Sequence, residues 1–253
     1  MSEKSDVEPK ILTRETGASI AYHTLAGKSP GIVFMTGFMS DMAGSKARAL
    51  EYLCRDRGHA FLRFDYQGHG ASSGNFADGT ISLWAEDALA AFDALTEGPQ
   101  VIVGSSMGGW IMLLTALARP DRVAGLVGIA AAPDFTEDLL PQSLTEEHLQ
   151  MIESDGVVVI PSDYEDPYTI TKALLDDGTH HVVMNTEIAL DCPVRLLHGL
   201  EDSSVPWQRS LTLQERLRSD DVEVTLIKGG DHRLSGDQDL KKLQKTAASL
   251  LSA

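Results

Sequence analysis

The sequence has few cysteines, few basic residues and no long apolar run. Its 253 residues include two cysteines, Cys54 and Cys192, which lie too far apart to form a CxxC or metal-ligand pair. A chain of this length builds a core without disulfides, so we expect both to be free thiols in a reducing compartment. The sequence therefore excludes a disulfide-stabilised small domain and predicts no metal site built on cysteines.

Basic residues are also few. The chain has 21 Lys and Arg and 37 Asp and Glu, which gives a formal net charge of -16. Such a surface repels nucleic acid and anionic membranes, and no segment reaches membrane-spanning length. Residues 1–10 carry acids and no apolar stretch, unlike a signal or transit peptide. We therefore expect a cytoplasmic protein with no nucleic-acid partner and no membrane span.

What the sequence does have is an alternation of apolar runs and stretches with helical spacing. Apolar runs rich in Val and Ile are typical of strands buried on both faces of a parallel sheet, and they occupy residues 31–35, 60–64, 101–103, 123–129, 193–197 and 222–227. Residues 10–14 and 18–25 flank Thr16-Gly17 and predict an N-terminal antiparallel hairpin. Helices are expected over 80–96 and from the end of the 101–103 strand to Arg119. The fold class is therefore α/β, with a mostly parallel sheet covered by helices on both faces.

One segment, residues 131–191, interrupts the alternation. It holds fourteen acids and one base, Lys172, and so accounts for most of the negative charge. Insertions of this kind often cover the ligand crevice of an α/β protein, so we interpret it as a small, partly helical lid on a single domain spanning residues 1–253. The alternative is an acidic, solvated flank without contact to a ligand.

A GxSxG motif follows the predicted strand at 101–103. Its residues are Gly104-Ser105-Ser106-Met107-Gly108, and an apolar helix comes next. Between a buried strand and a helix, these glycines permit a sharp turn that exposes the Ser106 hydroxyl above the sheet. Ser106 is therefore the predicted nucleophile. The neighbouring Ser105 is predicted to line the substrate pocket and not to attack the substrate.

A serine nucleophile needs a base and a group that orients the base. The strand at 193–197 leads into Asp202, and the strand at 222–227 leads into His232, which gives the order serine, acid, histidine. Of the eight histidines we select His232, because it alone follows the last strand. Glu201 and Asp231 remain as alternatives for the acid, since each is adjacent to a selected residue.

The developing oxyanion needs hydrogen-bond donors, and two backbone N–H groups suffice. We expect them from Met107, the residue after the nucleophile, and from Phe38, in the loop after the strand at 31–35. Gly37 lets that loop turn toward the site. Phe38 and Met39 are also candidates for lining an acyl pocket; the alternative is an ordinary strand-helix connection capped by Phe38.

These residues resemble the α/β-hydrolase superfamily. DYQGHGAS (65–72) is similar to the DxxGxGxS turn of its esterases, and HGLEDSSVP (198–206) to their HGxxDxxVP segment. GFMSDMAGSKA (37–47), RFDYQGHGASSGN (63–75), VGSSMGGWIML (103–113) and CPVRLLHGLEDSSVPW (192–207) are similar to its mitochondrial palmitoyl-protein thioesterase and acyl-glucuronide esterase members. The resemblance implies cofactor-free cleavage of an acyl ester, a thioester or an acylated protein.

We therefore predict a serine hydrolase of carboxylic esters or thioesters that works through an acyl-enzyme. A dehalogenase with an aspartate nucleophile is excluded by Ser106, whereas a serine peptidase, a C–C bond hydrolase and a non-catalytic ligand receptor on the same scaffold remain alternatives. Acyl length, leaving group and oligomeric state are left open.

Overall fold

The computed structural model describes residues 8–161 and 167–251 and contains a central eight-stranded sheet. The strands follow the order β1-β2-β4-β3-β5-β6-β9-β10. Their bounds are β1 Lys10–Thr13, β2 Ser19–Leu25, β3 Lys28–Met35, β4 His59–Phe64, β5 Gln100–Ser105, β6 Val123–Ile129, β9 Val194–Gly199 and β10 Val222–Ile227. Every strand expected from the apolar runs is therefore present.

The direction of the strands also agrees with the prediction. β1 and β2 form an antiparallel hairpin, β2 pairs antiparallel with β4, and all pairs from β4 to β10 are parallel. β5 continues two residues past the expected end because Ser105 pairs with Ile129 of β6. The parallel strands bring their carboxyl ends, and the loops that follow them, to one edge of the sheet.

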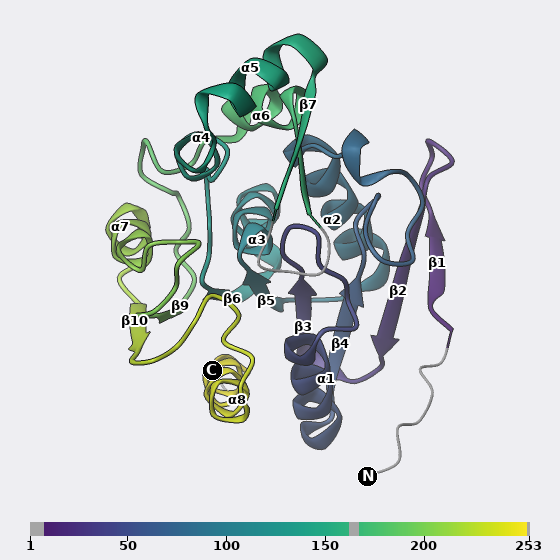
Figure 1. Ribbon diagram of the computed structural model, residues 1–253. Coiled ribbons are helices and arrows are strands. Elements are labelled where there is room, and N and C mark those ends of the chain that lie inside the picture. The colour runs from purple at the N-terminus through teal and green to yellow at the C-terminus, as the bar shows by residue number, and fades with distance from the viewer. Residues whose placement is uncertain (1–7, 162–166, 252–253) are drawn as a thin grey trace.

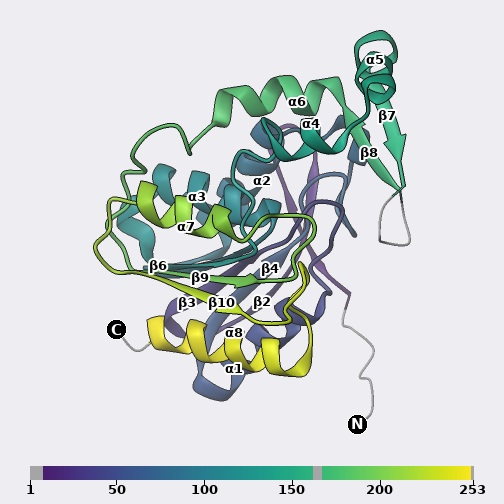
Figure 2. The same ribbon diagram turned by 60° about the vertical axis from the view of Figure 1, so that its left-hand side comes forward.

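Helices cover both faces of this sheet (Figure 2). α1 (Ser45–Arg57) and α8 (Asp237–Leu250) pack on one face, while α2 (Ile81–Leu95), α3 (Met107–Ala118) and α7 (Gln208–Arg216) pack on the other. Short 3-10 turns occur at η1 (Phe76–Asp78) and η2 (Pro120–Arg122). The mostly parallel α/β architecture is confirmed.

Local signals set the ends of the two central helices. Thr80 is the N-cap of α2, where its side chain accepts a hydrogen bond from the Leu83 N–H at 3.2 Å. α3 ends at Ala118, since the residue before Pro120 is disfavoured in helical geometry. α3 is apolar on almost every side and packs against both the sheet and α2.

The segment between β6 and β9 contains both helices and a two-stranded antiparallel sheet. It contains α4 (Leu139–Ser143), α5 (Glu146–Asp155), α6 (Lys172–Gly178) and the 3-10 turn η3 (Thr179–His181), together with an antiparallel pair, β7 (Val157–Ile160) and β8 (Tyr168–Thr171). Leu144, Ile152, Val158 and Ile170 give it a small core of its own. The β7–β8 hairpin differs from the expected helical insertion, although its Val157–Ile160 run resembles those of the sheet strands. In Figure 1 this segment lies at the top of the molecule.

Some sequence predictions fall partly on residues that the structure does not describe. Residues 162–166 of the 131–191 insertion and residues 1–7 of the N-terminal segment are among them. Within 8–161 and 167–251, no helix is long and apolar enough to cross a membrane. Cys54 and Cys192 are both free, and burial raises the pKa of their thiols to about 12 and about 11.

Candidate functional site

Ser106 occupies a strained turn between β5 and α3. Its φ of 54° and ψ of -121° lie outside the usual regions for a residue with a side chain, and it is the N-cap of α3. The motif glycines allow this turn, because a Cβ on Gly104 would lie 2.2 Å from the Gly108 carbonyl oxygen, and one on Gly108 would lie 2.2 Å from that of Met35. The helix therefore packs against the strand with the hydroxyl at its N-terminus.

Two further side chains meet Ser106 from the loops after β9 and β10. His232 Nε2 lies 3.1 Å from Ser106 Oγ, and His232 Nδ1 lies 2.8 Å from Asp202 Oδ2. Although His232 and Ser106 are 126 residues apart, the carboxyl ends of the strands converge at this edge. The arrangement is a hydroxyl, an imidazole and a carboxylate in hydrogen-bonding sequence, which can activate the hydroxyl as a nucleophile.

Four donors surround the buried Asp202 carboxylate. Oδ1 accepts hydrogen bonds from the Ser204 and Val205 N–H groups at 2.9 and 2.8 Å, while Oδ2 faces His232 and His198. Burial alone raises the pKa of this carboxyl, but the hydrogen bonds from His198 and His232 outweigh burial and hold the pKa well below its ordinary value. Asp202 is therefore an anion throughout the neutral range.

The two alternative acids, Glu201 and Asp231, have hydrogen-bond partners other than His232. Glu201 is exposed, and its N–H donates to the Gly230 carbonyl at 2.9 Å. Asp231 uses its carboxylate to accept the Leu234 N–H at 2.9 Å. The acid that contacts His232 is thus Asp202.

The loop after β3 lies directly against the nucleophile. A Cβ on Gly37 would lie 3.3 Å from Ser106 Cβ, which places the following Phe38 beside the site. The Phe38 ring is held by four others, with centroid distances of 4.8 to 5.9 Å to Phe76, Trp84, Phe135 and Tyr168. On the other side, Met107 is the first residue of α3, where a backbone N–H has no acceptor within the helix.

A cavity of about 650 Å³ opens at Ser106 and His232. The three predicted pocket residues, Phe38, Met39 and Ser105, all line it. Lys46 of α1 and Tyr168 of β8 line it as well, and burial lowers the pKa of Lys46 to about 8. Tyr168 shows that the 131–191 insertion reaches the site.

Sequence reasoning did not select His198, Lys46 or Tyr168. His198 looked like any histidine at the end of a strand, although the spacing of HGxxD places it four residues before Asp202. Lys46 and Tyr168 carry no local signal, because only the packing of α1 and the hairpin brings them to the cavity. Among the described residues, no group of His, Cys, Asp or Glu side chains is arranged to hold a metal ion.

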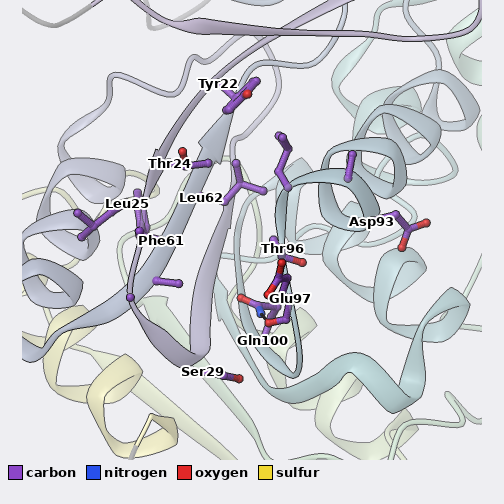
Figure 3. Close-up of a pocket in the computed structure, with 15 residues that line it drawn as sticks. Tyr22, Thr24, Leu25, Ser29, Phe61, Leu62, Asp93, Thr96, Glu97 and Gln100 are labelled. Carbon is purple, nitrogen blue, oxygen red and sulfur yellow. Dashed lines mark hydrogen bonds between the residues drawn. The ribbon is translucent and has the colours of Figure 1, made fainter.

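A second cavity, of about 710 Å³, lies near the amino ends of β4 and β5, away from Ser106 (its lining residues are drawn in Figure 3). It is formed by residues of β2, β4 and the end of α2, and Asp93 and Glu97 are among its lining residues. The described lining contains no histidine, lysine or cysteine, and the hydroxyl of Ser29 donates to the Pro99 carbonyl at 3.0 Å. It therefore lacks a nucleophile with a base.

Comparisons with known proteins identify the family of the chain. A family model described as serine aminopeptidase S33 (Hydrolase_4) matches residues 28–154. The mouse mitochondrial palmitoyl-protein thioesterase ABHD10 is 45% identical over 245 residues, 95% of this chain and 82% of that protein. The solved structure of mouse α/β-hydrolase domain-containing protein 10 has a TM-score of 0.89 at 42% identity and covers 97% of this chain and 99% of that one. A putative hydrolase from Agrobacterium vitis S4 has a TM-score of 0.92 at 38% identity, covering 98% and 100%.

The expected cytoplasmic location is wrong. The mouse relative is named as a mitochondrial protein, and this points to a mitochondrial location. Charge and cysteine content of a folded domain do not decide its compartment, because sorting is read from address signals and not from the core.

Proposed function

The chain belongs to the α/β-hydrolase family, and from this premise we propose that it is a serine hydrolase that cleaves carboxylic esters or thioesters. The observation that carries the proposal is the hydrogen-bonded series from Ser106 through His232 to Asp202 at the mouth of a cavity. The thioesterase named among the relatives supports acyl thioesters as one substrate class.

In the proposed mechanism, His232 Nε2 takes the proton of Ser106 as Oγ attacks the acyl carbon. Asp202 accepts the hydrogen bond from His232 Nδ1–H, which fixes the tautomer and stabilises the imidazolium. The imidazolium then protonates the leaving alcohol or thiol, and an acyl-enzyme forms on Ser106. Water, deprotonated by the same imidazole, attacks this ester and releases the acid and the free serine.

We assign the oxyanion hole to the N–H groups of Phe38 and Met107. The position of Phe38 beside Ser106 and that of Met107 at the start of α3 support the assignment. The helix N-terminus adds a partial positive charge at the place where the oxyanion develops. Each donor in such a site contributes roughly 3 to 4 kcal/mol to the transition state.

The insertion at 131–191 acts in this proposal as a lid within a single domain that spans residues 1–253. Tyr168 supports the lid because it both lines the cavity and contacts the Phe38 ring, with 5.9 Å between centroids. Phe38, Met39 and Ser105 would contact the acyl group. The substrate is then a small acyl ester or thioester, or an acylated protein.

Replacement of the nucleophile tests this proposal. Ser106→Ala is expected to abolish both hydrolysis of p-nitrophenyl and thioester substrates and labelling by a fluorophosphonate, while Ser249→Ala, on the exposed face of α8, keeps both. Full labelling of a folded Ser106→Ala protein would overturn the scheme or move the nucleophile to Ser105.

A second candidate is a peptidase, and the description of the matching family model favours it. The same acyl-enzyme chemistry would then act on an amide. A panel of acyl esters of increasing chain length, measured beside aminoacyl amides, separates the two functions. If kcat/KM is higher for the aminoacyl amides than for the acyl esters, the protein is a peptidase and the esterase proposal is wrong.

A further inference from the structure

His198 is a buried imidazole that touches the acid of the site and has no part in the mechanism above. It is the penultimate residue of β9, and its side chain is fully buried, as is that of Asp202. Its Nε2 lies 3.1 Å from Asp202 Oδ2, the same oxygen that faces His232. One carboxylate oxygen therefore lies between two imidazoles.

The surroundings of the ring define which nitrogen carries a proton. Nε2 faces two acceptors, the Asp202 carboxylate at 3.1 Å and the Val205 carbonyl at 2.9 Å, so it must be a donor. Nδ1 lies 2.7 Å from Ser210 Oγ of α7, a hydroxyl that can donate to it. The ring is thus held from β9, from α7 and from the loop that carries Asp202.

We propose, on the basis of the proposed function, that His198 is a positioning residue: its Nε2–H holds the Asp202 carboxylate in the orientation that His232 requires and limits the basicity of that carboxylate. Oδ1 is already fixed by the Ser204 and Val205 N–H groups. Without the His198 donor, Asp202 Oδ2 would have His232 as its remaining partner. The carboxylate and the His232 ring could then rotate together away from the orientation that Ser106 requires.

The second donor also affects proton affinity at His232. A donor on Oδ2 withdraws negative charge from the oxygen that stabilises the imidazolium, so its loss should favour protonated His232. Besides Asp202, the charged groups near His232 are Asp231 and Arg233 in its own loop, Asp41 in the loop after β3, and Lys46 of α1. The Lys46 Nζ donates to the Arg233 carbonyl at 2.6 Å. These groups stay unchanged when His198 is replaced.

Two substitutions separate positioning from packing. His198→Gln keeps an N–H donor near the place of Nε2, whereas His198→Leu fills the space without a donor. We expect His198→Leu to lower kcat roughly 10- to 100-fold, the effect of one lost hydrogen bond to a charged group, with little change in KM. The acid limb of its kcat/KM profile should move to higher pH, and His198→Gln should restore much of kcat.

The matched control is His59→Leu, a buried histidine at the amino end of β4 whose Nδ1 lies 2.7 Å from the Pro30 carbonyl. It should lower stability without moving the pH profile. Nitrogen-15 NMR of the histidines in the wild-type protein provides a test that needs no variant: a proton on His198 Nε2 supports the proposal, and an unprotonated Nε2 overturns it.

The two proposals fail in different ways. If Ser106→Ala keeps its activity, the hydrolase mechanism is wrong whatever His198 does. If Ser106→Ala is inactive and a folded His198→Leu protein keeps the wild-type kcat and pH profile, only the positioning role is overturned. Equal losses of kcat in the Gln and Leu variants, both folded, would likewise reject a role that depends on the donor.

Discussion

At the scale of single residues, the site depends on one strained backbone position. Ser106 has a positive φ, and the close approach of Gly104 to Gly108 and of Gly108 to Met35 leaves room for no side chain at either glycine. Strain of this kind persists only where the surrounding structure over-determines it. Here β5, β6 and α3 do so, since the Ser106 N–H donates to the Ile129 carbonyl at 2.9 Å.

Asp202 gives a prediction about stability and pH. Because its pKa is lowered in the folded protein, its charge stabilises the fold above the unfolded-state pKa, about 3.9. That contribution should be constant at neutral pH and decline as the pH falls below about 4 toward the folded-state pKa. Urea unfolding of the wild type and of Asp202→Asn at pH 7, 5, 4 and 3 measures it, and the stability difference should narrow only at the acid end. A difference that is the same at every pH would contradict the lowered pKa.

At the scale of elements, buried or partly buried carboxylates hold the two ends of the insertion together and attach the insertion to α2. The buried Asp134 carboxylate accepts the Val183 and Met184 N–H groups at 3.0 and 2.7 Å, which closes the two ends of the segment on each other. Asp177 of α6 accepts the Ser82 N–H at 2.8 Å and the Ser82 hydroxyl at 2.6 Å, at the N-terminus of α2. The hairpin, with its separate core, reaches the site through Tyr168.

Asp177 therefore provides a test of this attachment. Asp177→Ala should lower the free energy of unfolding by about 1 to 3 kcal/mol, because it leaves the first turn of α2 without its acceptor. It should also speed limited proteolysis within 131–191. The neighbouring Asp176→Ala, which removes an exposed ion pair to Lys172, should change stability by less than about 0.5 kcal/mol. Equal effects of the two substitutions would show that Asp177 does not anchor the insertion.

At the scale of the whole molecule, negative charge is concentrated on one segment. The formal charge is -16, and the insertion, with fourteen acids and one base, carries most of it. Tyr168 of this segment lines the cavity, so we expect the negative potential of the segment to extend toward the entrance. The arrangement favours encounter with cationic substrates or basic segments of proteins.

Ionic strength tests this steering. The kcat/KM of a cationic ester, such as a choline thioester, should fall as salt rises from about 0.01 M to about 1 M, where the Debye length falls from about 30 Å to about 3 Å. A neutral ester of the same acyl group is the control and should show little change. Equal salt dependence of the two esters would remove the steering hypothesis.

The sequence by itself determined the strands, the hairpin, the strand-turn-helix around Ser106 and the places of Asp202 and His232 at strand ends. These features are local: apolar runs, glycines and the residues that follow them are visible within a few positions of each other. The same local pattern did not show that Val157–Ile160 pairs with Tyr168–Thr171, since nothing in either segment specifies its partner.

Only the tertiary structure decided which of these residues touch. The 3.1 Å contact between His232 and Ser106, the second imidazole on Asp202 and the arrival of Lys46 and Tyr168 at the cavity all join distant parts of the chain. Such distances are set by how the sheet twists and the helices pack, so they depend on the sum of many contacts and on no single motif.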